Sequence, residues 1–111
     1  MIAKFIQCGD AIDYTPATAV AAGDVVQLAD LVGVAKLDIP AGKLGALSVV
    51  GVFDFPKSTG AGQDIALGAR LYWDAATNKV LKAQVAGEPV LGKAVAAAGE
   101  SDLTVRVRLE Q

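Results

Sequence analysis

One segment of the chain resembles a phosphate-binding loop, the motif that would carry nucleotide chemistry. Residues 51–58 follow the pattern of glycine, four residues, glycine, lysine and serine, except that Pro56 stands where the second glycine belongs. A phosphate cradle needs a run of free backbone N–H groups at the start of a helix, and proline supplies none. The residues before Pro56 are typical of a strand, and a glycine-rich loop follows instead of a helix. We therefore interpret this segment as the end of a strand.

Cys8 is the single cysteine of the chain and its candidate nucleophile. A thiol needs a base or a positive field to become a thiolate near neutral pH, and the sequence contains no histidine. We expect Cys8 to be a small apolar packing residue. With one cysteine no intrachain disulfide can form, which fits a reducing cytoplasm.

The 12 acidic residues offer no recognisable metal or acid–base site. Asp10 and Asp13 lack further ligands at a useful spacing, no calcium-loop pattern occurs, and zinc would find neither histidine nor a second cysteine. Other aspartates fall at expected strand ends, where the side chain commonly bonds the local backbone: Asp24, Asp30, Asp54 and Asp74. We expect no catalytic residue, no metal and no cofactor, and hence a protein that is not an enzyme.

Because aromatic residues make up only 5% of the chain, each is a candidate anchor for a partner. Tyr72 and Trp73 are adjacent, so on a strand they face opposite sides, and one should be in the core while the other is at least partly exposed. We take Trp73 and Tyr14 as candidate interaction residues. The alternative for the outer member of the adjacent pair is that it merely covers one end of the fold.

Residues 103–109 alternate between apolar and polar side chains and predict the last strand. Leu103, Val105, Val107 and Leu109 would share the core face. Arg106 and Arg108 would share the other face, either as a solvated surface or as a pair that contacts acidic residues of a neighbouring subunit or partner.

The N-terminal segment is apolar before the first clear turn, with Met1, Ile2, Phe5 and Ile6. As a free arm it would expose hydrophobic surface and call for a partner. As a first strand within the body it would need no partner. Both interpretations stay open, and Phe5 and Ile6 are candidate interaction residues.

Short apolar runs with a glycine recur along the chain, for example at Leu31–Ala35, Val49–Phe53 and Val90–Val95. They are too short and too rich in valine for helices and predict buried strands in which glycine allows a bend or a close backbone approach. Leu44–Phe55 reads as one long strand bent near Gly51. The pattern predicts an all-β fold, a small single-domain barrel or sandwich of about eight short strands, with residues 1–17 as an N-terminal arm or first strands and 18–111 as the body.

The charge of the chain bears on its partners. A formal net charge of −2 with scattered basic residues is a poor match for nucleic acid, whose binding depends on lysine and arginine. No apolar run is long enough for a membrane-spanning helix. We expect neither nucleic acid nor a membrane as a partner.

Taken together in their order and spacing, seven short segments resemble the capsid cement, or decoration, proteins of tailed bacteriophages, a family that also carries a recombinase-like label. The matching segments are Phe5–Asp10, Ala22–Val26, Leu31–Ala35, Gly51–Lys57, Gly68–Asp74, Leu91–Ala94 and Val105–Leu109. The resemblance implies a non-enzymatic protein, made in the bacterial host cytoplasm, that binds the outer surface of the phage head. Its partners would be the major capsid protein and itself, often as a homotrimer.

Two other classes of function remain as alternatives. The chain could be another β-rich part of the virion, such as a tail or head-fibre component. It could also be a barrel that binds a small ligand or an oligonucleotide, although the few aromatic residues and the negative charge disfavour single-strand binding.

Overall fold

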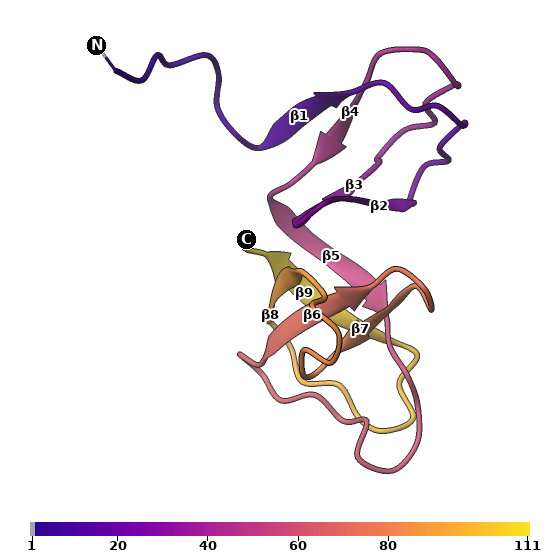
Figure 1. Cartoon of the computed structure of the whole chain (residues 1–111). Coiled ribbons are helices and arrows are strands. Elements are labelled where there is room, and N and C mark those ends of the chain that lie inside the picture. Colours follow the sequence, from indigo (N-terminus) through magenta and orange to yellow (C-terminus); the bar gives the residue numbers. More distant parts are fainter. Residues whose placement is uncertain (1) are drawn as a thin grey trace.

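The computed structural model describes residues 2–111, which form nine β-strands and no helix (Figure 1). The first sheet has four antiparallel strands in the order β1 (Ala11–Tyr14), β4 (Gly45–Ser48), β3 (Leu31–Val34) and β2 (Val25–Leu28). The second has five, in the order β5 (Gly51–Pro56), β9 (Thr104–Leu109), β8 (Val90–Ala94), β6 (Arg70–Asp74) and β7 (Lys79–Leu81). The predicted all-β class is confirmed.

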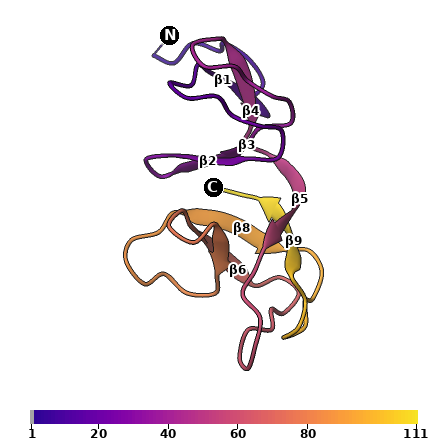
Figure 2. The same ribbon diagram turned by 90° about the vertical axis from the view of Figure 1, so that its right-hand side faces the viewer.

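The two sheets are not closed into a barrel, so the arrangement is sandwich-like. They lie one beyond the other in Figure 1 and again in the view of Figure 2, turned by 90°. In the second sheet an isolated parallel bridge joins Lys57, just after β5, to Val80 in β7. A single bridge is not a continuous ladder, and the sheet remains open.

The expected long strand over Leu44–Phe55 is wrong. The chain forms β4, leaves it at Val49 and Val50, and enters β5, which belongs to the other sheet. At the start of β5, Gly51 has a φ of 130°, a conformation that side-chain-bearing residues rarely adopt. Apolar periodicity cannot show such a change of sheet, because both strands are rich in apolar residues.

Two hairpins agree with the sequence-based prediction. Strands β2 and β3 are joined by the two residues Ala29 and Asp30, and Ala29 has a positive φ of 53°, as tight hairpin turns require. Strands β6 and β7 pair from Tyr72 with Leu81 to Asp74 with Lys79.

The main core belongs to both sheets. Val32 and Val34 of β3 pack with residues of the second sheet, among them Phe55, Trp73 and Leu91. A second, small cluster of Ala35, Ile39 and Leu47 lies within the first sheet and its loops. The larger cluster therefore holds the sheets together.

The C-terminal residue adds a polar link between the sheets. The side-chain amide of Gln111 donates to the carbonyl of Val32 and its oxygen accepts from the N–H of Val32, both at 2.6 Å. The amide thus satisfies both backbone groups of one β3 residue, as a neighbouring strand would.

Candidate interaction surfaces

The N-terminal segment lies outside both sheets. Residues 2–10 form no strand and are all exposed, and in Figure 1 they extend from β1 away from the body. Phe5 is 79% exposed and Ile6 is 76% exposed. Residues 2–10 therefore form an arm and not a first strand of the body. Met1 lies outside the described residues. The arm presents apolar side chains without covering them.

The two aromatic candidates, by contrast, lie inward. Trp73 is 1% exposed and packs edge to face on Phe55, with ring centroids 5.7 Å apart. The prediction that one member of the Tyr72–Trp73 pair is buried and the other partly exposed is confirmed, with Tyr72 as the half-buried one. Tyr14 is also half-buried and packs against the small cluster of the first sheet.

The last strand alternates as expected from Thr104 onward, with Val105, Val107 and Leu109 buried. Leu103 is an exception: it is 75% exposed, because β9 begins one residue later and Leu103 belongs to the preceding loop. Its expected place on the core face is wrong.

Arg106 and Arg108 are on the exposed face of β9, as predicted. Arg106 lies directly opposite Asp54 of β5, and its Nε donates to Asp54 Oδ1 at 3.0 Å. The hydrogen bond to Asp54, with the attraction between the charges, raises the pKa of Arg106. Arg106 therefore has a partner within its own chain.

Arg108 lies in a different setting. Register places it opposite Val52 of β5 on one side and Lys93 of β8 on the other, and Lys93 in turn lies opposite Arg70 of β6. Sequence reasoning found the arginine pair and missed Lys93 and Arg70. These residues come together only through the strand order β9-β8-β6, because β6 and β8 are separate segments of the sequence that contribute one basic residue each.

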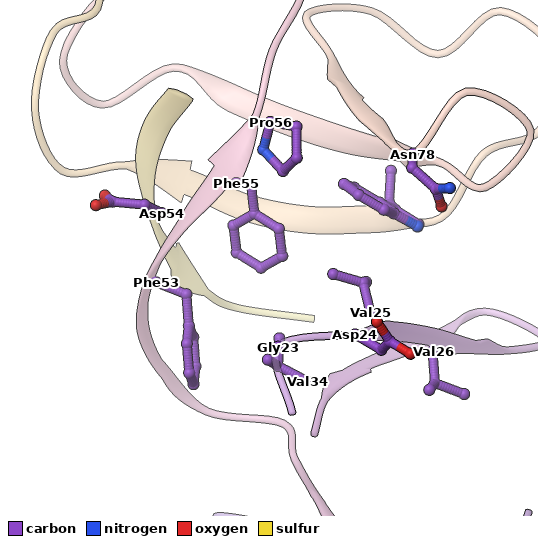
Figure 3. A pocket seen from close by; sticks show the side chains of 11 residues that line it. Gly23, Asp24, Val25, Val26, Val34, Phe53, Asp54, Phe55, Pro56 and Asn78 are labelled. Carbon is purple, nitrogen blue, oxygen red and sulfur yellow. The ribbon is translucent and has the colours of Figure 1, made fainter. Parts of the chain in front are cut away.

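A cleft of about 540 Å³ lies between the sheets (Figure 3). Phe53 and Phe55 of β5 line one side, and Val25 and Val34 of the β2–β3 hairpin line the other. The polar side chains among its lining residues are those of Asp24, Asp54 and Asn78. Nothing in this arrangement forms a catalytic set.

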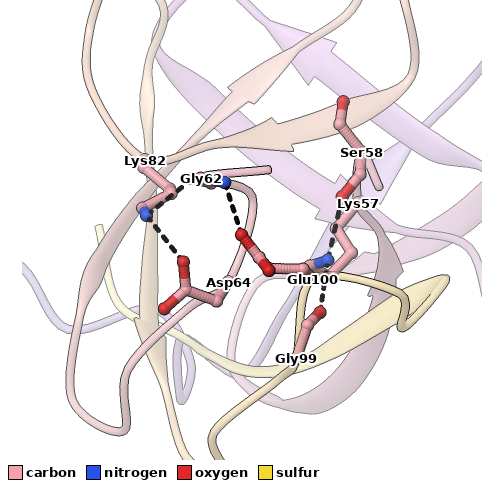
Figure 4. A network of polar contacts seen from close by, with 7 residues as sticks. All are labelled: Lys57, Ser58, Gly62, Asp64, Lys82, Gly99 and Glu100. Atoms are coloured by element: carbon pink, nitrogen blue, oxygen red, sulfur yellow. Dashed lines mark hydrogen bonds and ion pairs between the residues drawn. The ribbon is translucent and has the colours of Figure 1, made fainter. Parts of the chain in front are cut away.

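The segment that resembles a phosphate loop has a structural role. Lys57 is 3% exposed, and its ammonium donates to the carbonyls of Ser58 at 2.8 Å, Gly99 at 2.9 Å and Asp102 at 3.0 Å. Figure 4 shows this contact beside the bond from the Gly62 N–H to the Glu100 carboxylate. The lysine faces inward and ties the loop after β5 to the loop before β9. The interpretation of this segment as a strand end is confirmed, because β5 ends at Pro56.

Cys8 and three of the aspartates discussed above lie in separate places in the structure. Cys8 is exposed on the arm, so its expected role as a packing residue is wrong. Asp24 accepts from the N–H of Ala21, and Asp74 accepts from the N–H of Ala76, as expected for turn aspartates. Asp54 instead pairs with Arg106 across the sheet.

Residues 2–111 offer neither a metal-binding cluster nor a membrane-spanning helix. No three histidine, cysteine, aspartate or glutamate side chains lie together in a way that could hold a metal ion. Nor does this part of the chain form a helix long and apolar enough to cross a membrane.

The fold and its exposed features are those of a small all-β structural domain: two packed sheets, a projecting apolar arm and a charged sheet face. Residues 6–109 match the family described as phage cement protein, and the chain belongs to this family. No curated protein and no solved structure matches it. Family membership implies association with the phage capsid, a place in the virion and a structural role.

Proposed function

We propose that the chain is a non-enzymatic decoration protein that binds the outer surface of the phage head and stabilises it by bridging neighbouring capsid subunits. The observation that carries this proposal is the family match, which spans nearly the whole chain. The two-sheet body supports it as well. A body held by a shared core loses little conformational freedom on docking, and repetition over many sites multiplies modest contacts.

The partners in this proposal are the major capsid protein and further copies of the chain, as a homotrimer. The protein would be made in the cytoplasm of the bacterial host and would then bind the assembled head. Neither nucleic acid nor a membrane takes part.

The arm is the first contact that we assign to the shell. Its apolar residues Phe5 and Ile6 are exposed, and β1, which follows it, is an edge strand paired with β4. An edge strand presents unpaired backbone groups, to which a segment of the shell can add as a further strand. Residues 1–17, which include the arm and the edge strand β1, would then act as the docking element, and residues 18–111 would supply the remaining strands of the body.

Trp73 and Tyr14 contribute differently in this scheme. Since Trp73 is in the core and Tyr14 is half-buried, they support the surfaces that dock. Replacing Trp73 would test folding before it tests docking.

Co-sedimentation with expanded heads that lack the protein tests the proposal. Wild-type chain should pellet with heads to saturation, and Phe5→Ser with Ile6→Ser should weaken this binding. Leu37→Ser with Leu44→Ser is the matched control, because both leucines are similarly exposed but lie in loops of the first sheet. Wild-type chain that stays in the supernatant at all concentrations would refute the proposed function. If the arm variant binds heads as tightly as wild type, the arm does not contribute to docking.

A further inference from the structure

Three basic side chains form a continuous row across the outer face of the second sheet. Arg70 of β6 lies opposite Lys93 of β8, and Lys93 lies opposite Arg108 of β9. All three are exposed. Directly opposed residues share one face of a sheet, with strands about 4.8 Å apart, so the three charges are close neighbours. We call these residues the basic row.

Neighbouring carboxylates neutralise little of this row. Glu110 is 3.9 Å from the Lys93 ammonium, at the limit of an ion pair, and both side chains are about half exposed. Asp54 is engaged by Arg106. Within residues 2–111, Arg70 and Arg108 form no ion pair with any carboxylate. The face thus has an excess of positive charge in a chain whose formal net charge is −2.

This arrangement costs stability in the free chain. Like charges directly opposite one another in a sheet repel, and a solvated face would gain from alternating signs. The chain has 12 acidic residues, yet none lies within the row. A carboxylate of a partner would relieve the repulsion. The row is therefore more favourable when bound to an acidic partner than when exposed to solvent.

The surroundings of the row also fit a protein partner. A hollow of about 260 Å³ is lined by Arg70, Lys93 and Glu110, among others. Val52, 53% exposed, lies opposite Arg108 at the other end of the row. Arginine is enriched in protein interfaces, where its planar guanidinium can hold a carboxylate through two hydrogen bonds.

We propose that the basic row docks on an acidic patch of the capsid shell, with Arg70 and Arg108 each binding a carboxylate of the shell protein. This inference rests on the proposed function and gives it a second contact, separate from the arm. Nucleic acid fits the row less well. Three cations beside the carboxylate of Glu110 offer few phosphate contacts, whereas affinity for a duplex grows with the number of phosphates neutralised.

The test compares two double variants with equal loss of charge. Arg70→Gln with Arg108→Gln removes both ends of the row. Lys36→Gln with Lys43→Gln removes two exposed lysines outside it and is the control. Binding to expanded heads is measured by co-sedimentation from about 50 to 300 mM salt, with thermal unfolding and light scattering of each free protein.

We expect the row variant to bind heads about tenfold or more weakly at low salt and with a shallower dependence on salt, while the control binds as wild type. The thermal midpoint of the row variant should equal or exceed that of wild type, because the repulsion between like charges has been removed. Equal binding by row variant and wild type would overturn the inference and leave the proposed function intact. Failure of wild type to bind would overturn both.

Two further outcomes would also overturn the inference. If the row variant changes the oligomeric state of the free protein, the row joins copies of this chain. If wild type retards double-stranded DNA at about 50 mM salt and the row variant does not, the row binds phosphates.

Discussion

Gly92 in β8 lies against the backbone carbonyl of Arg108 in β9, so closely that no β-carbon fits between them. This glycine is thus required by the approach of two strands at the centre of the second sheet. Gly92→Ala should force β8 and β9 apart and lower the free energy of unfolding by about 3 kcal/mol, at the upper end of overpacking costs. Denaturant unfolding of the purified chain measures this change.

Gly9→Ala is the control for this prediction, because a β-carbon at position 9 would meet nothing within 4 Å. It should change the free energy of unfolding by less than about 0.5 kcal/mol. A Gly92→Ala protein as stable as the control would show that β8 and β9 are spaced differently.

Lys57 should be replaceable only at a cost to stability. Lys57→Met keeps the length of the side chain but removes the donor for three carbonyls, those of Ser58, Gly99 and Asp102. Hydrogen bonds from a charged group are worth roughly 1.5–3 kcal/mol, so we expect a loss of about 2 kcal/mol or more in unfolding free energy. Lys79→Met, on an exposed lysine of β7, should have little effect. Similar stability of the two variants would argue against an inward-facing Lys57.

The side chain of Gln111 should protect the backbone amide of Val32 from hydrogen exchange with solvent. Gln111→Ala removes both hydrogen bonds to the backbone of Val32 and should cost about 1 kcal/mol, with faster hydrogen exchange at the Val32 amide. Gln63→Ala, in an exposed loop, is the comparison. Unchanged exchange at Val32 would mean that the C-terminal residue does not link the sheets.

Glu88 gives the fold a contribution that depends on pH. Its carboxylate accepts from the N–H groups of Ala86 and Val85, both at 2.8 Å, and these bonds lower its pKa from the ordinary value of 4.5. A lowered pKa in the folded state stabilises the fold above the pKa of the unfolded chain, and this contribution is lost as pH falls through the folded value.

Glu88→Gln should therefore be less stable than wild type at pH 7, and the difference should shrink as pH falls below 4.5. Thermal unfolding of both proteins from pH 7 to pH 3 measures this difference in stability. A difference that stays constant or widens in acid would contradict the assigned bonds.

The class of fold could be predicted from the sequence because β-branched apolar runs and turn residues are local signals. The β2–β3 hairpin and the alternation of β9 are examples. The break between β4 and β5 could not be predicted, because apolar residues dominate Leu44–Phe55 on both sides of it and the change of sheet depends on tertiary packing.

The candidate surfaces were predictable to different degrees. Phe5 and Ile6 are exposed, and one of the two interpretations of their segment placed them so. Arg70 and Lys93 could not be associated with Arg108, since their proximity follows from the order β9-β8-β6 and from register. The strand end at Pro56 could be predicted, but the acceptors of Lys57 could not, because the carbonyls of Gly99 and Asp102 lie more than 40 residues away in the sequence.

Heat challenge of phage heads tests the central claim most directly. Heads lacking the protein are saturated with wild-type chain, and the temperature at which packaged DNA becomes accessible to a dye is compared with that of bare heads. A cement that bridges subunits must raise this temperature, and the row and arm variants should raise it less at the same concentration. Heads that are saturated with bound chain but release DNA at the temperature of bare heads would contradict the account.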